Sequence, residues 1–315
     1  MIHVIHRDDI WDFNNVTIAG DILREFERQG CKLHSETSFD AAGHSLVNSN
    51  DVILVHISLK NESNQQRMAQ LSNRKVIWGV DESKPDRILF KTERDYAKRL
   101  GFEAVVTPFP SVRNVSSLTE DGINVISMMH SLHYHDFPRT FNKQYDVLVS
   151  GNLTPSYYPV RYKIANAILS SKKFKTGFIP FPGYSIAQNP GQIMGGDYIK
   201  AASQCWIGIT CKAGWCDRLL AKYIEFGKGC CLPIGDVPTF IPASLEREML
   251  VVTEDHTDSE IVRMVEEALH DKVALTSRIN RYRDYLEENH ELTKRVSETI
   301  TKIETRCYDF PKRET

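Results

Sequence analysis

The sequence lacks several features that would assign it directly to a class of protein. Among its 315 residues, no apolar run approaches the roughly 18 residues that cross a bilayer. Its first residues, MIHVIHRDDIWDF, show neither the basic nor the apolar segment of a signal peptide. We therefore expect a cytoplasmic protein without a transmembrane segment.

Neither sign of charge is in excess, because 39 basic residues are interspersed with 41 acidic ones and the net charge is −2. A protein that binds nucleic acid mainly through its phosphates usually carries a basic excess or a basic block. The balance weakens the case for a nucleic-acid substrate without excluding one.

Metal-site cysteine patterns are also missing. The seven cysteines form no C-x-x-C pair, and Cys230 and Cys231 are adjacent. Adjacent cysteines suit buried, reduced thiols better than a metal site. We expect no metal site and no resident cofactor.

What the first half does contain is an alternation of short apolar runs with helical patterns. The expected strands are 2–5, 51–57, 75–80, 103–107 and 123–129, and the expected helices are 18–26, 65–71 and 90–100. Strands that alternate with helices indicate parallel β-α-β units. We predict an α/β domain over residues 1–135.

The second half repeats this plan after a polar segment at 131–142, which we interpret as a linker. Strands are expected at 145–150, 174–181, 205–210, 230–235 and 249–253, with helices between them. Pro159 suits a first helical position, and Thr257-x-x-Glu260 is a capping box. We predict a second α/β domain at 143–290, and a terminal helix and tail at 291–315.

Two such sheets would bind ligands outside the carboxyl ends of their strands. The fold class we predict is therefore α/β, with two Rossmann-like domains facing a cleft and helices at the C-terminus.

The most informative stretch is DRLLAKYIEFGKGCCLPIG, from Asp217 to Gly235. If a helix spans 217–226, Arg218, Lys222 and Glu225 fall at i, i+4 and i+7 and share one face. Such a face can bind a diphosphate by charge and a sugar hydroxyl by hydrogen bond. The alternative is a solvated amphipathic helix with salt bridges.

A second set of residues follows the expected strand 145–150. Gly151 allows the backbone to approach a ligand closely, and the next helix start, with Arg161, presents free N–H groups to an anion. The alternative is an ordinary turn between a strand and a helix.

These motifs resemble those of the glycosyltransferases of the GT-B class, in particular the group-1-like members. The resemblance covers roughly residues 145–300 and rests on Arg218-Leu-Leu-Ala-Lys222-Tyr-Ile-Glu225, on YIKAASQCWIGIT and on YYPVR. Without an Asp-x-Asp motif, the metal-dependent class of transferases is not supported.

The resemblance implies a nucleotide-sugar co-substrate and a carbohydrate or glycoconjugate acceptor, with a nucleic-acid acceptor not excluded. Glu225 would bind ribose or sugar hydroxyls, and Arg218 and Lys222 would neutralise the diphosphate. The remaining donor-binding residues that we predict are Gly151, Asn152, Arg161 and Asp217.

An inverting transferase also needs a base, which we expect in the first domain at the carboxyl end of a strand. Asp9 and Asp81 are our candidates, beside His6 and the histidines at 130, 133 and 135. Two other functions stay open at this point: a sugar-nucleotide epimerase-like enzyme, and a non-enzymatic two-domain protein that closes on a small ligand.

Overall fold

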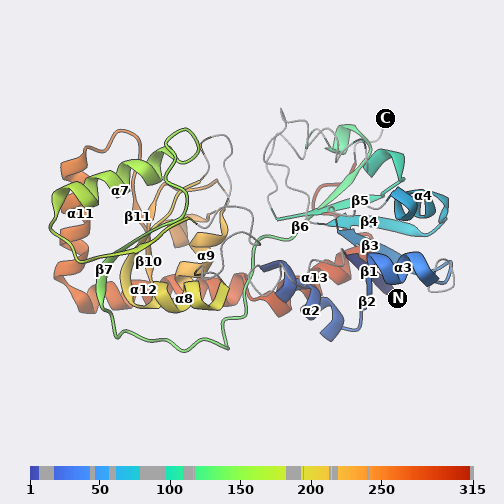
Figure 1. Cartoon of the computed structure of the whole chain (residues 1–315), viewed down its shortest axis with the longest axis horizontal. Helices are drawn as coiled ribbons and strands as arrows, with labels where there is room; N and C mark the ends of the chain where they lie inside the picture. Colours follow the sequence, from blue (N-terminus) through green and yellow to red (C-terminus); the bar gives the residue numbers. More distant parts are fainter. Residues whose placement is uncertain are drawn as a thin grey trace. The chain divides into compact units, whose positions relative to one another are not determined.

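The computed structural model describes residues 1–6, 18–42, 47–56, 62–78, 95, 97–108, 116, 118–181, 193, 195–212, 214, 219–239 and 241–312. The chain divides into two compact units, one of Met1–Met129 with Leu292–Thr315 and the other of His130–Glu291. Each unit is built on one β-sheet with helices beside it (Figure 1). Among the helices of these ranges, none is long and apolar enough to cross a membrane.

The first unit has a six-stranded sheet in the order β2-β1-β3-β4-β5-β6, in which neighbouring strands are parallel. Its strands are β1 (Ile2–His6), β2 (Lys32–Ser35), β3 (Val52–His56), β4 (Arg74–Trp78), β5 (Ala104–Thr107) and β6 (Asn124–Ser127). Successive strand residues point to opposite faces, so Val4 and Ile5 enter two different hydrophobic clusters. The sheet therefore has an apolar layer on each face, as parallel sheets require.

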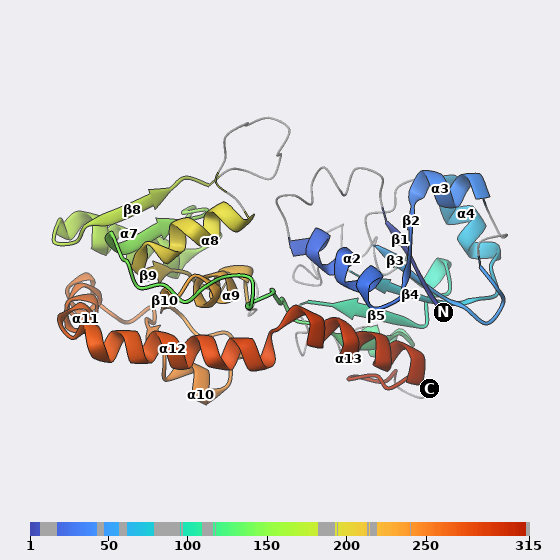
Figure 2. The same cartoon turned by 90° about the horizontal axis from the view of Figure 1, so that it is seen from below.

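Helices from both ends of the chain cover this sheet. They are α2 (Ile18–Arg28), α3 (Glu36–Ala42), α4 (Glu62–Gln70) and α13 (Leu292–Thr305). Leu292, Val296 and Ile303 of α13 join the cluster of Val4 and Phe26, and α13 packs beside α2 (Figure 2). Of the segment that the sequence marks as a terminal helix and tail, helix α13 thus packs on the first unit.

The second unit has a five-stranded parallel sheet in the order β11-β10-β9-β7-β8. Its strands are β7 (Tyr145–Ser150), β8 (Thr176–Ile179), β9 (Cys205–Ile209), β10 (Leu232–Gly235) and β11 (Leu250–Val251). Its helices are α7 (Pro159–Ser171), α8 (Gly195–Ser203), α9 (Ala221–Lys228), α10 (Ala243–Glu246), α11 (Asp258–His270) and α12 (Lys272–Asn289). The predicted α/β class, with Rossmann-like parallel sheets and C-terminal helices, is confirmed.

Two of the predicted helix starts are confirmed in detail. Helix α7 begins with Pro159. Helix α11 begins with a complete capping box, in which Glu260 Oε2 accepts the Thr257 N–H at 2.7 Å and Thr257 Oγ1 accepts the Glu260 N–H at 3.3 Å. Both signals act locally, which is why the sequence alone reveals them.

The polar segment that follows β6 belongs to the second unit. Buried Arg283 of α12 donates hydrogen bonds to the carbonyl oxygens of Tyr134 and Phe137 at 3.0 and 2.6 Å, and to that of Lys228 at 3.1 Å. The Tyr134 hydroxyl donates to the Ile224 carbonyl at 3.3 Å. One guanidinium thus ties the segment predicted as a linker to the end of α9.

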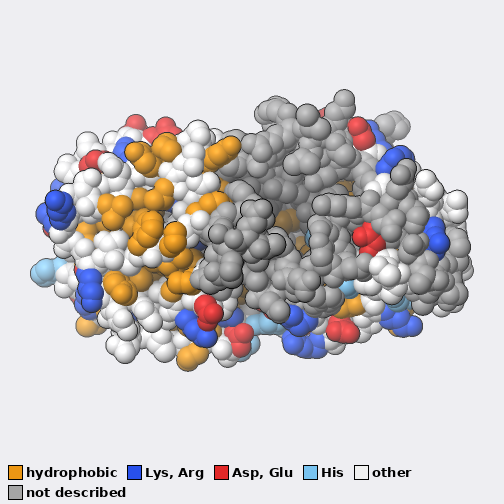
Figure 3. All heavy atoms as spheres, in the orientation of Figure 1, with side chains coloured by type: hydrophobic (Ala, Val, Ile, Leu, Met, Phe, Trp, Pro, Cys, Tyr) orange, Lys and Arg blue, Asp and Glu red, His pale blue; other side chains and the backbone are white. Residues whose placement is uncertain are grey.

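Helix α7 is apolar on two sides. Val160, Ile164 and Ile168 are buried, while Tyr162 and Leu169 lie seven positions apart and are exposed. Hydrophobic side chains gather on the visible face of this unit in Figure 3. On the edge strand β8, Phe178 is 60% exposed. These exposed apolar side chains lie outside the hydrophobic core of the unit.

Candidate functional site at the end of strand β7

Two cationic side chains converge where strand β7 ends. Gly151 follows β7 with φ of +84°, a conformation that favours glycine. A Cβ at this position would lie 2.7 Å from Cε of Lys222 and 3.1 Å from Nη1 of Arg161. Three residues that the sequence singled out separately therefore meet at one point.

Arg161 reaches this point from the first turn of α7. Its side chain is 2% exposed and lies over the ring of Tyr158, with Cζ 4.3 Å from the ring centroid. Nη1 donates to the carbonyl oxygen of Asn152 at 3.2 Å, but buried Nε has no hydrogen-bond partner among the described residues. A buried, incompletely bonded guanidinium suits an anionic ligand.

Asn152 contributes to the site through its backbone. Its side-chain Oδ1 accepts the backbone N–H of Thr154 at 2.8 Å and so shapes the loop that follows β7. Its carbonyl oxygen holds Arg161. The amide side chain is thus used within the loop.

Lys222 approaches from the first turn of α9 and is partly buried. Its Nζ donates to the hydroxyl of Tyr198 at 2.7 Å and lies 4.0 Å from the centroid of the same ring. Burial, and to a smaller extent the charge of Arg161, lower the pKa of Lys222 to about 8, against the opposing attraction of Glu225. The ammonium is held here at an electrostatic cost that a bound anion would offset.

Glu225 lies three residues after Lys222, on the same side of α9. Burial raises the pKa of its carboxyl group, and the charges of Lys222 and Arg161 oppose that rise. Within the described ranges, no ion pair or side-chain hydrogen bond involves this carboxylate. It is therefore available to accept hydrogen bonds from ligand hydroxyls.

Helices α7 and α9 both begin without a capping side chain, at Tyr158 and Leu220. The first N–H groups of a helix lack partners within the helix, and the helix dipole favours negative charge there. With Arg161 and Lys222 in these same first turns, the end of β7 combines two charges with two helix N-termini. This is an environment for a phosphate or diphosphate.

The predicted helix over 217–226 is wrong at its start. Leu220 has extended backbone angles, φ −74° and ψ 154°, and α9 begins at Ala221. Lys222 and Glu225 share a face of α9. Asp217 and Arg218 themselves lie outside the described residues.

Sequence reasoning missed Tyr198 in this cluster. Tyr198 of α8 lies between Lys222 and Ser150, the last residue of β7, and its hydroxyl is 2.7 Å from Ser150 Oγ. Burial raises the pKa of Tyr198 well above its usual value, so the phenol is neutral. Tyr198 opens the phrase YIKAASQ, but spacing alone gives no reason to pair it with Lys222.

The predicted bases of the first unit are not placed by the structure. Asp9 and Asp81 lie outside the described residues. His6 is the buried last residue of β1, and His133, in the second unit, pairs with Glu291 at 3.1 Å. In the described ranges, no group of three or more His, Cys, Asp or Glu side chains could hold a metal ion.

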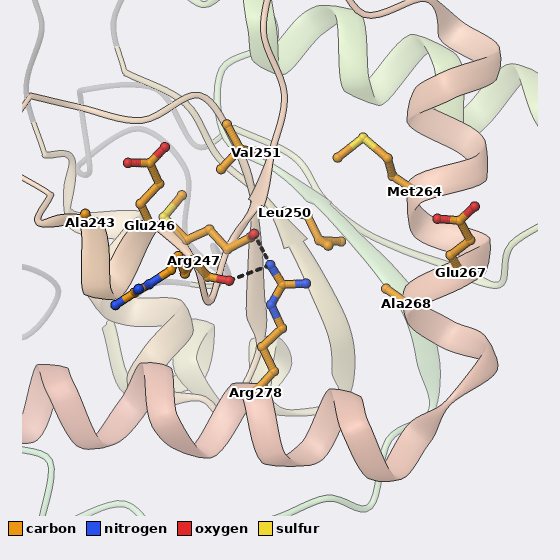
Figure 4. A pocket seen from close by; sticks show the side chains of 10 residues that line it. Ala243, Glu246, Arg247, Leu250, Val251, Met264, Glu267, Ala268 and Arg278 are labelled. Atoms are coloured by element: carbon orange, nitrogen blue, oxygen red, sulfur yellow. Dashed lines mark hydrogen bonds between the residues drawn. The ribbon is translucent and has the colours of Figure 1, made fainter.

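The second unit also contains an open groove of about 750 Å³ between α10, β11, α11 and α12. Arg278 points into it and donates to the carbonyl oxygens of Arg247, at 2.9 Å, and Met249 (Figure 4). Glu246 and Glu267 line it as well, so its charges are mixed. The groove shares no residue with the cluster at Gly151.

Comparison with known protein families and with curated protein sequences finds no match. Solved structures do match. Sucrose-phosphate synthase from Thermosynechococcus elongatus superposes with a TM-score of 0.66 at 9% identity, covering 97% of this chain and 98% of that one. The DNA-modifying enzyme β-glucosyltransferase superposes with a TM-score of 0.61 at 11% identity, and the match covers 96% of this chain and 100% of that enzyme.

A third similar structure, the GtfA/B complex, has a TM-score of 0.52 at 12% identity. This match covers 83% of the present chain but only 58% of the length of the GtfA/B chain. Identities this low establish the fold and no more. The chain has the two-unit α/β fold of the GT-B glycosyltransferases, and the resemblance seen in the sequence is confirmed at this level.

Proposed function

We propose that the chain is a glycosyltransferase whose second unit binds a nucleoside diphosphate sugar. The observation that carries this proposal is the convergence of Arg161 and Lys222 at Gly151, beside the carboxylate of Glu225, which forms no ion pair within the described residues. The similarity of the fold to glycosyltransferases supports it.

Each residue has a role in such a reaction. When the bond between sugar and diphosphate breaks, negative charge develops on the leaving oxygen and positive charge on the sugar carbon. Arg161 and Lys222 would stabilise the leaving diphosphate without a metal ion, as preorganised cations do. Glu225 would accept hydrogen bonds from ribose or sugar hydroxyls, and Gly151 would let the phosphates approach the backbone. Asp217 and Arg218 remain proposed members of the same site.

A uridine nucleotide is the first donor to test, since β-glucosyltransferase was solved with uridine diphosphoglucose. For the acceptor we propose a carbohydrate or glycoconjugate. That neighbour is a DNA-modifying enzyme, so DNA belongs in the assay as well. Asp9 and Asp81 remain our candidates for the base that removes the acceptor proton.

The donor is identified by a thermal-shift screen against UDP-, GDP-, CMP- and dTDP-linked sugars and the free nucleotides. A ligand at 100 times its Kd adds roughly 2.7 kcal/mol of stability, which raises the melting temperature measurably. The responding donor is then supplied with a radioactive sugar to glycan and DNA acceptors, with and without EDTA. Metal-independent transfer is the expected result.

The same assay separates the alternatives. An epimerase-like enzyme converts the donor without any acceptor, and a binding protein leaves it unchanged. Glu225→Gln should reduce transfer at least tenfold, whereas Glu266→Gln, at an exposed ion pair with Lys173, should leave it within twofold. An unchanged melting temperature with every nucleotide and nucleotide sugar in the screen would contradict the proposal.

A further inference from the structure

The hydroxyl of Tyr198 lies between two residues of the candidate donor site. It is 2.7 Å from Nζ of Lys222 and 2.7 Å from Oγ of Ser150. An ammonium group can only donate hydrogen bonds, so the phenol oxygen accepts from Lys222. Its own hydrogen is then free to be donated to Ser150. The hydroxyl thus connects α8 and α9 to the end of β7.

The ring of Tyr198 also has two neighbours. One of its faces carries the Lys222 ammonium, 4.0 Å from the ring centroid, a distance at which a cation is attracted to the ring. The ring also stacks on Phe226, with centroids 6.3 Å apart. A phenylalanine would keep the packing and the attraction to the ring, so the hydroxyl is present for its polar contacts.

The contact with Tyr198 keeps Lys222 away from the obvious alternative partner. Glu225 lies one helical turn further on α9, yet no ion pair joins the two side chains in the described part of the chain. Because Lys222 binds a neutral phenol instead, its positive charge and the negative charge of Glu225 both remain for a ligand. A long lysine side chain free to rotate would lose this arrangement, and it would also lose rotamer entropy when a ligand binds.

We propose that Tyr198 is a positioning residue, which holds the Lys222 ammonium at the place where the donor diphosphate binds. This inference rests on the proposed function of the site. Tyr198 acts through Lys222 and needs no contact with the donor itself. The contribution of the Tyr198 hydroxyl to affinity should therefore depend on the phosphates of the ligand, and it should disappear when Lys222 is replaced.

A double-mutant cycle tests this coupling. The affinities of UDP and of uridine are measured by titration calorimetry for the wild type, Tyr198→Phe, Lys222→Met and the double variant. Tyr162→Phe, on the exposed side of α7, is the matched control. Y198F should weaken UDP binding about fivefold to twentyfold, change uridine binding less than twofold, and have no further effect on UDP in the K222M background.

Each other outcome is decisive. Equal losses for UDP and uridine, an additive loss in the double variant, or unchanged UDP binding in Y198F would overturn the positioning role. If Y198F does not fold, the positioning role would also be overturned, because the hydroxyl would then be required for the stability of the protein. Unchanged UDP binding in K222M would instead count against the proposed donor site, so the two failures are distinguishable.

Discussion

Gly151 and Lys222 lie so close that a Cβ on the glycine would come within 2.7 Å of Cε of the lysine. A side chain at residue 151 would therefore have to displace the end of the lysine side chain from this place. The positive φ of +84° adds a second reason for glycine at this position. Gly151 and Lys222 are thus close neighbours in space, although they lie 71 residues apart in the sequence.

Gly151→Ala should therefore displace Lys222 and weaken nucleotide binding. We expect at least a tenfold rise in the Kd of UDP, together with a lower melting temperature from backbone strain. Gly196→Ala is the control, because a Cβ there meets nothing within 4 Å. Equal UDP affinities for the wild type and G151A would show that the close approach has no functional meaning.

Nucleotide binding should depend on pH through Lys222. Its pKa of about 8 means that the ammonium is charged below this value and neutral above it. UDP affinity should be nearly constant from pH 6.5 to 7.5 and fall above pH 8, by at most about tenfold per pH unit. K222M should remove this fall, and calorimetric titrations over the pH range measure it. A fall of the same size in K222M would assign the dependence to another group.

Lys222 should also cost the protein stability. Its pKa is about 8 in the folded chain and about 10.4 in an unfolded one, so between these values the unfolded chain binds more protons and stability rises with pH. Below pH 8 the charged form is held at a cost. K222M should thus melt at a higher temperature than the wild type at pH 7, and the difference should shrink as the pH rises past 8. Calorimetric melting measures this difference, and a lower melting temperature for K222M at pH 7 would contradict it.

Arg283 should be essential to the stability of the second unit. Arg283→Met removes a donor from the carbonyl oxygens of Tyr134, Phe137 and Lys228 in a largely buried place, and of these the Tyr134 oxygen keeps the Phe137 N–H at 3.2 Å. We expect a loss of roughly 3 kcal/mol or more in urea unfolding. Arg281→Met, which removes an exposed pair with Glu248, should change stability little. A similar small effect of both variants would show that the buried contacts do not anchor the segment.

The parts of the fold that the sequence predicted are those with local signals. Thr257 and Glu260 cap a helix through their own neighbours, and Pro159 fits only the first turn of α7. Apolar runs in β3 and β7 mark buried strands for the same reason. Strand β2 was not predicted, since KLHS is short, partly exposed and at the sheet edge.

The start of α9 could not be predicted, because Leu219, Leu220 and Ala221 are all good helix formers and no capping residue marks the boundary. His290 and Glu291 separate α12 from α13. At the candidate site, residue type and motif single out Gly151, Arg161, Lys222 and Glu225. Their convergence, and the role of Tyr198, depend on contacts between α7, α8 and α9 that spacing does not encode.

The most direct test of the donor site is the titration of UDP into the wild type, Lys222→Met and Lys200→Met by calorimetry. Lys200 lies exposed on α8, where the same substitution should leave UDP affinity within twofold. Lys222→Met should weaken UDP binding at least tenfold. Equal affinities for the wild type and Lys222→Met, or no binding of UDP or any other nucleoside diphosphate to the wild type, would contradict the account.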